Sequence, residues 1–178
     1  MKRSLTFSTI AIALIALALG TSLTTPVMAC TKNLVNYTDE DRDGIIEVGE
    51  KVYFEIDIKT HNYWGTTAEN VILKDRFGAE LEVVDWTCEG TYEKDPVFYT
   101  KGKSEKVFLD WYIGTHEPGE EAIIHLTMAT DLNPAGKQEY TSPGTYTLNS
   151  GAVVKKIYAG VKYSWETDQL TIEVLEPN

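Results

Sequence analysis

Carboxylate side chains recur between residues 39 and 50 at a spacing that suits a calcium ion. Calcium is a hard cation that takes about six to eight oxygen ligands. In chain order, the ligands on offer are Asp39, Asp41, Asp43, the backbone carbonyl of Ile45, Glu47 and Glu50. Gly44 stands where such a loop must turn sharply and a Cβ would be strained. The segment therefore predicts a structural Ca2+ site, with Ile46 pointing back to anchor the loop on an apolar neighbour.

The order of these ligands is that of an EF-hand calcium loop, but the flanking sequence does not predict helices. Residues 33–37 show no helical period, and residues 51–59 alternate strictly between apolar and polar side chains. Alternation with a period of two is typical of a half-buried strand. We therefore expect a calcium loop that leads into a β-strand. The simpler alternative is an acidic turn built on Asp43 and Gly44.

Alternating apolar residues recur in short segments throughout the rest of the chain, with turn residues between them. The inward-facing sets are Val52, Phe54, Ile56 and Ile58; Val107, Leu109, Trp111 and Ile113; Ala122, Ile124, Leu126 and Met128; and Leu170, Ile172 and Val174. Further strands are expected at 71–75, at 80–86 and at 145–158, the last as one strand with a bulge at 150–151. Residues 61–70 and 87–106 are expected as loops, the second with a weak hairpin as its alternative. No segment keeps a helical period, so the sequence predicts an all-β sandwich.

The N-terminus has the features of a secretory signal peptide. Lys2 and Arg3 precede a short apolar run at residues 10–19, and small or aliphatic residues follow at 27–29. That run is too short to span a membrane. We expect a signal peptide at 1–29, an extended arm at 30–38 and the β-sandwich domain at 39–178, with no transmembrane segment once the signal is removed.

The two cysteines allow two exclusive outcomes. Cleavage after Ala29 leaves Cys30 free, and in an oxidising compartment it could form a disulfide with Cys88. Alternatively, the sequence VMAC acts as a lipobox and Cys30 carries a lipid. Ordinary cleavage is the preferred interpretation, since the apolar run and the small-residue site suffice for it.

Composition argues against several functions. The chain has 16 basic and 27 acidic residues, a net charge of −11, so it lacks the clustered cations that hold nucleic acid. The three histidines, His61, His116 and His125, are isolated, and no nucleophile is placed with a base. We therefore expect no enzyme. His125 alternates with inward-facing residues and should face solvent.

Aromatic residues and one sequon complete the candidate sites. Trp64, in an expected loop beside Tyr63, could contact a glycan, whereas Trp111 lies on the inward face of its strand and should belong to the core. Asn36 begins the sequence Asn-Tyr-Thr, an N-glycosylation acceptor in secreted proteins. Its place beside the acidic loop would put a glycan on the surface.

Four segments in order resemble a cell-surface repeat of archaea and bacteria, known as domain of unknown function eleven. They are DEDRDGIIEVGE leading into VYFEIDIKTHN, AENVILKD at 68–75, WYIGTHEPGEEAIIHLT at 111–127 and LNSGAVV at 148–154. The resemblance covers most of residues 39–175. It implies an immunoglobulin-like antiparallel β-sandwich, a surface location and a structural or adhesive role without enzymatic activity.

These observations favour a secreted, extracellular or cell-surface protein that is stabilised by calcium. Binding of the ion would relieve the repulsion between the carboxylates and fix the direction of the N-terminal arm. A sharper version is a filament subunit whose arm, Thr31–Tyr37, adds as a donor strand to a neighbouring copy. Partners would then be other surface proteins or copies of itself. The alternative is a carbohydrate-binding module on the cell surface, or a protein anchored by lipid through Cys30.

Overall fold

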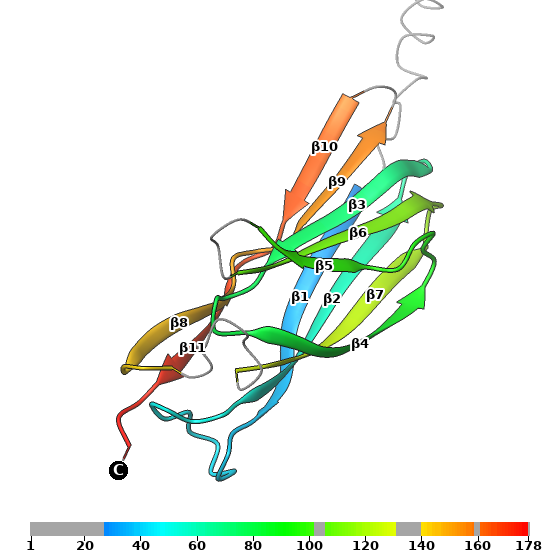
Figure 1. Ribbon diagram of the computed structural model, residues 1–178. Coiled ribbons are helices and arrows are strands. Elements are labelled where there is room, and N and C mark those ends of the chain that lie inside the picture. Colours follow the sequence, from blue (N-terminus) through cyan, green and yellow to red (C-terminus); the bar gives the residue numbers. More distant parts are fainter. Residues whose placement is uncertain (1–26, 102–105, 131–139, 159–160, 178) are drawn as a thin grey trace, which may run out of the picture.

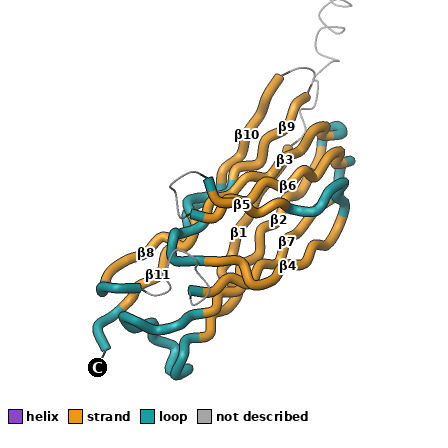
Figure 2. The backbone as a smooth tube through the Cα atoms, viewed as in Figure 1, coloured by secondary structure: helices purple, strands orange, loops and turns teal. Residues whose placement is uncertain are grey.

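Apolar and polar side chains alternate along the strands, so each sheet has one apolar face, and two sheets pack with these faces together. The computed structural model describes residues 27–101, 106–130, 140–158 and 161–177, and every regular element in these ranges is a β-strand (Figures 1 and 2). The named strands pair antiparallel throughout, and side chains from both large sheets share one core. The predicted immunoglobulin-like antiparallel β-sandwich is confirmed.

Eleven strands are described in these ranges. One sheet has the order β1 (Val27–Thr38), β2 (Tyr53–Trp64), β7 (Glu121–Ala129) and β4 (Glu82–Gly90). The facing sheet has the order β10 (Val161–Glu166), β9 (Val153–Tyr158), β3 (Ala68–Arg76), β6 (Val107–His116) and β5 (Val97–Thr100). A two-stranded ribbon of β11 (Leu170–Val174) and β8 (Gly144–Asn149) lies at the end of the sandwich that carries the C-terminus (Figure 1).

The core is filled by the alternating residues that the sequence singled out. Three of the four inward sets are fully buried as predicted, those of β6, of β7, and of β2 with Val52 just before it. In β11, Ile172 and Val174 are buried and Leu170 packs against the core from a partly exposed position. Burying such a side chain contributes about 1.5–3 kcal/mol each. These sets therefore hold the two layers together.

The N-terminal segment differs from the expected free arm. Residues 30–38 belong to strand β1, which pairs with β2 of the same chain from Val27 to Thr38. Met28, in front of the predicted cleavage point, is only 1% exposed and lies in the core. The donor-strand hypothesis is therefore wrong for the fold described, because the arm already fills an edge of its own sheet. Residues 1–26 of the predicted signal peptide lie outside the described residues.

Two connections differ from their sequence-based predictions. Strand β2 extends to Trp64 and β3 begins at Ala68, so the expected loop 61–70 is short. In the described part of 87–106, strands β4 and β5 do not pair with each other: β4 pairs with β7 in one sheet and β5 pairs with β6 in the other. The chain between Gly90 and Val97 therefore crosses from one layer to the other.

Strands β8 and β9 are not one bulged strand. The first pairs with β11 and the second with β3 and β10, and the chain turns sharply between them at Gly151, whose φ is +101°. The amide of Gly151 donates a 2.8 Å hydrogen bond to the side-chain oxygen of Asn149, which closes the turn. Strand β10 was not predicted. It is an edge strand, where Tyr163 and Trp165 are half-buried and Ser164 and Glu166 are exposed.

Candidate functional site

The acidic loop joins β1 to β2 and brings three of the predicted calcium ligands together. Side-chain oxygens of Asp39, Asp41 and Asp43 all lie within 4.8 Å of one another. Two oxygens that each lie about 2.4 Å from one calcium ion can be no more than about 5 Å apart. The spacing of these three carboxylates therefore suits a shared cation.

One oxygen of this group has no hydrogen-bond partner among the described residues. Asp39 is 4% exposed, and its Oδ2 accepts a 2.9 Å hydrogen bond from the amide of Gly44. Its Oδ1 is buried and accepts no hydrogen bond. A buried carboxylate oxygen without a partner is costly, and a bound cation is one way to satisfy it. A cation held by the three aspartates would satisfy this oxygen.

The loop backbone is folded around this point by its own side chains. Asp41 Oδ1 accepts from the amide of Asp43 at 3.0 Å, and Asp43 Oδ1 accepts from the amide of Ile45 at 2.7 Å. Arg42 and Gly44 have φ angles of +67° and +83°. Short-range hydrogen bonds of this kind, in which an aspartate side chain accepts from a nearby backbone amide, stabilise tight turns. The repeated aspartates thus shape the loop as well as furnish its ligands.

The remaining predicted ligands are placed differently. The carboxylate of Glu50 accepts from the amides of Glu40 and Glu47 at 2.6 and 2.9 Å, so it closes the loop across its mouth. Glu47 and Glu50 do not belong to the group of three aspartates. Ile45 is 39% exposed, and its predicted ligand is the backbone carbonyl, since an isoleucine side chain carries no oxygen. The structure therefore brings three of the six predicted ligands together, and the calcium site stays a prediction.

The loop is tied to both ends of the domain. Ile46 is 4% exposed and packs in the core, which confirms its predicted role as an anchor. The carbonyl of Ile46 accepts from the amide of Leu175 at 2.9 Å, just after β11. The hydroxyl of Tyr37, near the end of β1, donates to the carbonyl of Gly44 at 2.6 Å. An ion in this loop would therefore brace the junction of β1, β2 and the C-terminal strand.

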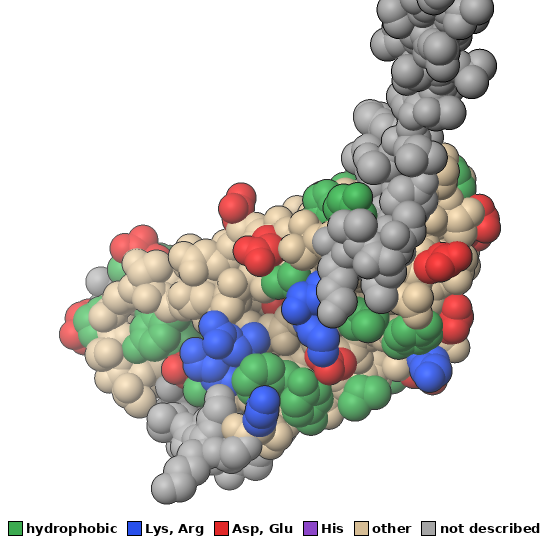
Figure 3. Space-filling model, turned by 90° about the horizontal axis from the view of Figure 1, so that it is seen from above, with side chains coloured by type: hydrophobic (Ala, Val, Ile, Leu, Met, Phe, Trp, Pro, Cys, Tyr) green, Lys and Arg blue, Asp and Glu red, His purple; other side chains and the backbone are tan. Residues whose placement is uncertain are grey.

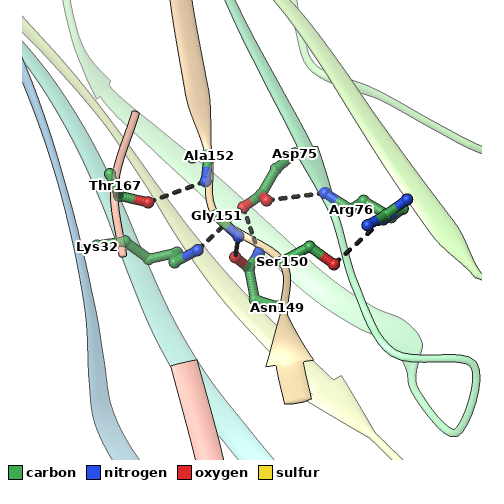
Figure 4. A network of polar contacts seen from close by, with 8 residues as sticks. All are labelled: Lys32, Asp75, Arg76, Asn149, Ser150, Gly151, Ala152 and Thr167. Carbon is green, nitrogen blue, oxygen red and sulfur yellow. Dashed lines mark hydrogen bonds and ion pairs between the residues drawn. The ribbon is translucent and has the colours of Figure 1, made fainter. Parts of the chain in front are cut away.

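A second polar group lies inside the sandwich (Figure 4). Lys32 of β1, Asp75 of β3 and Asn149 at the end of β8 are at most 8% exposed, and the side chains of Lys32 and Asp75 are fully buried. Lys32 Nζ lies 4.0 Å from Asp75 Oδ2 and makes no hydrogen bond to the part of the chain that the structure describes. The same Oδ2 accepts a hydrogen bond from the Asn149 amide, and Asp75 Oδ1 accepts from the amide of Arg76 at 2.7 Å.

Burial shifts the titration of this pair. Loss of solvation lowers the pKa of Lys32, although the charge of Asp75 acts in the opposite direction. Loss of solvation likewise raises the pKa of Asp75, against the effects of Lys32 and Asn149. Both shifts favour the uncharged forms. The pair is therefore poorly described as a salt bridge, which would also need closer hydrogen-bonded contact to offset desolvation.

Sequence reasoning missed this group, although the sequence contains a signal for it. Lys32 stands two residues from Cys30 and from Leu34, and so shares their inward face in an alternating strand. Asp75 shares the face of Val71 and Leu73 in the same way. A lysine or aspartate at an inward strand position is unusual and needs a partner. The prediction of an extended arm at residues 30–38 hides this pattern, because it treats them as lying outside the sandwich.

The cysteines do not form the predicted disulfide. Both thiols are free, and Cys30 lies on β1 and Cys88 on β4, the two edges of the four-stranded sheet. With neighbouring strands about 4.8 Å apart, three strand spacings separate them by about 14 Å, whereas a disulfide needs Cα atoms within about 7 Å. Lipidation of Cys30 stays a prediction, and it would require this thiol to leave its packing against the core.

Burial raises the pKa of the Cys30 thiol from 9.0 to about 12. A raised folded-state pKa means that the stability due to the protonated thiol is present below pH 9.0 and is lost as the pH rises towards about 12. We expect the free energy of unfolding, measured by urea titration, to fall between pH 9 and 11 less steeply in Cys30→Ala than in the natural chain, by up to about 1.4 kcal/mol per pH unit. Equal slopes in the two chains would contradict the buried thiol.

Other predicted residues lie on the surface or outside the described part. Asn36 is exposed, as glycosylation requires, and His125 is partly exposed with its Nδ1 2.7 Å from Asp57. Tyr63 is 51% exposed and stacks on His61 at 4.2 Å between ring centroids. The side chain of Trp64 lies outside the described residues. Trp111 is buried as predicted.

The acidic excess is not gathered in one place on the face seen in Figure 3. Acidic side chains are scattered over this face, and basic side chains lie among apolar ones. Within the described residues, no helix has the length and apolar character needed to cross a membrane. These features leave the acidic loop and the buried Lys32–Asp75–Asn149 group as the two sites with a defined geometry.

Comparison with known proteins supports the fold and leaves the family open. No family model matches the chain. An uncharacterised protein of Archaeoglobus fulgidus is 35% identical over 88 residues, which are 49% of this chain and 31% of that protein. The chain therefore spans about a third of the relative that it matches. The resemblance to domain of unknown function eleven stays a prediction.

Two solved structures share the architecture at low sequence identity. The full-length major pilin SpaD from Corynebacterium diphtheriae matches with a TM-score of 0.50 and 12% identity, over 82% of this chain and 34% of the pilin. The RrgA Jo.In complex matches with a TM-score of 0.50 and 11% identity, over 80% of this chain and 77% of that one. At this identity the likeness concerns the fold.

Proposed function

We propose that this chain is a secreted, non-enzymatic cell-surface protein with a structural or adhesive role, in which a calcium ion stiffens one end of a β-sandwich. The observation that carries the proposal is the buried, unpartnered Oδ1 of Asp39 beside the carboxylates of Asp41 and Asp43. The signal peptide predicted at 1–29 and the pilin fold of SpaD support the surface location. Partners are other surface proteins or further copies of the chain.

The mechanism follows from what the loop touches. Without an ion, three carboxylates repel one another in a loop that also contacts β1 through Tyr37 and the C-terminal segment through Leu175. With calcium bound, this repulsion becomes attraction and the loop is held in one conformation. The ion would therefore fix the connection between the first strand and the end of the domain. Extracellular calcium is abundant, so a dissociation constant of about 10⁻⁴–10⁻³ M suffices.

Filament formation by donation of the N-terminal arm is not part of this proposal. Strand β1 is bound along its length to β2, so it is not free to leave. Its outer edge has no named strand beside it in the order of the four-stranded sheet. Self-association would therefore use exposed strand edges or side-chain surfaces of the folded domain.

Calcium titration tests the proposal directly. Calcium added to the chelator-treated chain should release or absorb heat as one site fills, and should raise the melting temperature. Asp41→Asn removes one of the three clustered carboxylates, so we expect it to weaken binding at least about tenfold, which is about 1.4 kcal/mol. Isothermal titration calorimetry and thermal melts measure the two effects.

The matched control lies in the same loop. Glu40 is exposed and is not one of the clustered carboxylates, so Glu40→Gln removes the same charge without removing a ligand. It should leave the affinity within about twofold, since a single exposed charge contributes little. Equal weakening by both variants would mean general attraction to an acidic loop. Absence of binding at millimolar calcium would contradict the calcium site and favour the alternative, in which the loop is only an acidic turn.

A further inference from the structure

The buried Lys32–Asp75–Asn149 group contains the parts of a bond-forming reaction. An amine, a carboxyl group and a carboxamide come from three different strands, and they share one oxygen, Oδ2 of Asp75. Lys32 Nζ has no hydrogen-bond partner, so nothing within the described residues ties up its lone pair or protons. A buried lysine without a hydrogen bond destabilises the folded protein. The same loss of solvation favours its neutral amine, which is a good nucleophile.

We propose that Lys32 and Asn149 become joined through their side chains by an isopeptide bond, with Asp75 moving the protons. The Nζ of Lys32 attacks Cγ of Asn149, and a new bond forms between these two atoms. The bond between Cγ and Nδ2 of Asn149 breaks, and Nδ2 leaves as ammonia. The proton lost by Nζ passes through the carboxyl group of Asp75 to the departing nitrogen. One amide replaces another, so no oxidant, reductant or cofactor is needed.

Burial shifts each ionisable side chain of the group toward the state that its role requires. Desolvation lowers the pKa of Lys32, which favours the neutral amine that can act as a nucleophile. Desolvation raises the pKa of Asp75, which favours a carboxyl group that can donate a proton to the leaving nitrogen. The hydrogen bond between Asp75 Oδ2 and Asn149 Nδ2 already joins the acid to the leaving group. This is the arrangement expected of a general acid and base.

The carbonyl of the carboxamide is also prepared for attack. Asn149 Oδ1 accepts a 2.8 Å hydrogen bond from the amide of Gly151, so this amide can stabilise negative charge as the tetrahedral intermediate forms. The conformation that aims this amide has φ of +101° at Gly151. A surface groove lined by Arg76, Ser150 and Thr167 opens beside the group, which gives ammonia a short way out.

The product also removes a defect of the starting group. The Lys32 amine is buried without a partner, and burying it in its charged form is costly. In the product, its nitrogen belongs to a neutral amide whose N–H can donate to Asp75. The bond would tie β1 directly to the end of β8, so force applied to the first strand would reach the far part of the sandwich through a covalent link. This inference does not depend on calcium.

Mass spectrometry of the full chain tests the bond. The N-terminal residue is first identified, and the mass of the chain from that residue is calculated. The measured intact mass should be lower than the calculated one by one molecule of ammonia. A protease digest should contain one branched peptide that joins Lys32 to Asn149. A succinimide at Asn149 would cause the same loss, but it reopens in mild alkali, whereas the isopeptide bond survives. Separate, unmodified Lys32 and Asn149 peptides from folded protein would overturn the proposal.

Variants distinguish the roles and have a matched control nearby. Asp75→Asn and Lys32→Met should both restore the full mass, and the unlinked protein should melt about 10–20 °C lower, since the bond closes most of the domain into one loop. Lys74 and Asp110 form an exposed pair at 2.6 Å, next in sequence to Asp75. Lys74→Met and Asp110→Asn should therefore keep the ammonia loss. If neither Asp75→Asn nor Lys32→Met folds, the presence or absence of the branched peptide in the natural chain still tests the isopeptide bond.

Discussion

Replacing Trp111 with alanine should lower the free energy of unfolding by about 3–5 kcal/mol, the range for truncating a buried aromatic side chain. Trp111 is fully buried on β6 and its ring lies 5.5 Å from that of Tyr92. Its Nε1 donates a 2.8 Å hydrogen bond to the carbonyl of Lys94. Tyr92 and Lys94 belong to the crossover between the two sheets. The variant therefore loses both core volume and the attachment of that crossover.

Urea unfolding followed by circular dichroism measures this effect, and Trp111→Phe serves as the control. Phenylalanine keeps most of the apolar contact but leaves the carbonyl of Lys94 without its donor, so we expect a smaller loss of about 1–3 kcal/mol. A loss below about 1 kcal/mol for Trp111→Ala would show that this side chain does not carry the packing described.

Gly90→Ala is expected to cost about 2–5 kcal/mol, from two separate causes. The φ of Gly90 is +85°, which costs other residues about 1–2 kcal/mol. A Cβ there would also press against the backbone carbonyl of Glu121, which accepts the 2.8 Å hydrogen bond from the amide of Thr91. Backbone cannot move away as a side chain can, so overpacking adds about 1–3 kcal/mol.

Gly119→Ala separates the two causes. Gly119 has a similar φ of +91°, but no atom of the described residues lies within 4 Å of the Cβ that would be added. Its variant should lose only the conformational part, about 1–2 kcal/mol. Thermal melts of both variants give the comparison. Equal losses would show that the contact with Glu121 is easily relieved, and the close approach of β4 to β7 would then be less rigid than described.

Sequence patterns located most of the core and the shape of the acidic loop. Alternation correctly placed the inward faces of β2, β6 and β7, because side chains of a strand point to opposite sides whatever lies around them. The aspartates at 39, 41 and 43 and the anchor at Ile46 were also found, because a loop of this kind is shaped by residues only a few positions apart.

Contacts between distant segments were not predictable in the same way. Cys30 and Cys88 are compatible with a disulfide by count and compartment, and only the strand order shows that two strands lie between them. Strands β8 and β9 look like one interrupted strand, and only their different partners assign them to different sheets. Strand pairing depends on the whole chain, so local sequence does not determine it.

The sequence by itself determined the alternating faces, the acidic loop and the acidic charge, since each depends on residue type and short spacing. The tertiary structure alone decided which distant residues meet. Lys32, Asp75 and Asn149 come from β1, β3 and β8, and no local rule relates their positions. They meet only when the two sheets and the ribbon of β8 and β11 pack together, and burial there changes the pKa values of an ordinary lysine and aspartate and makes chemistry between them possible.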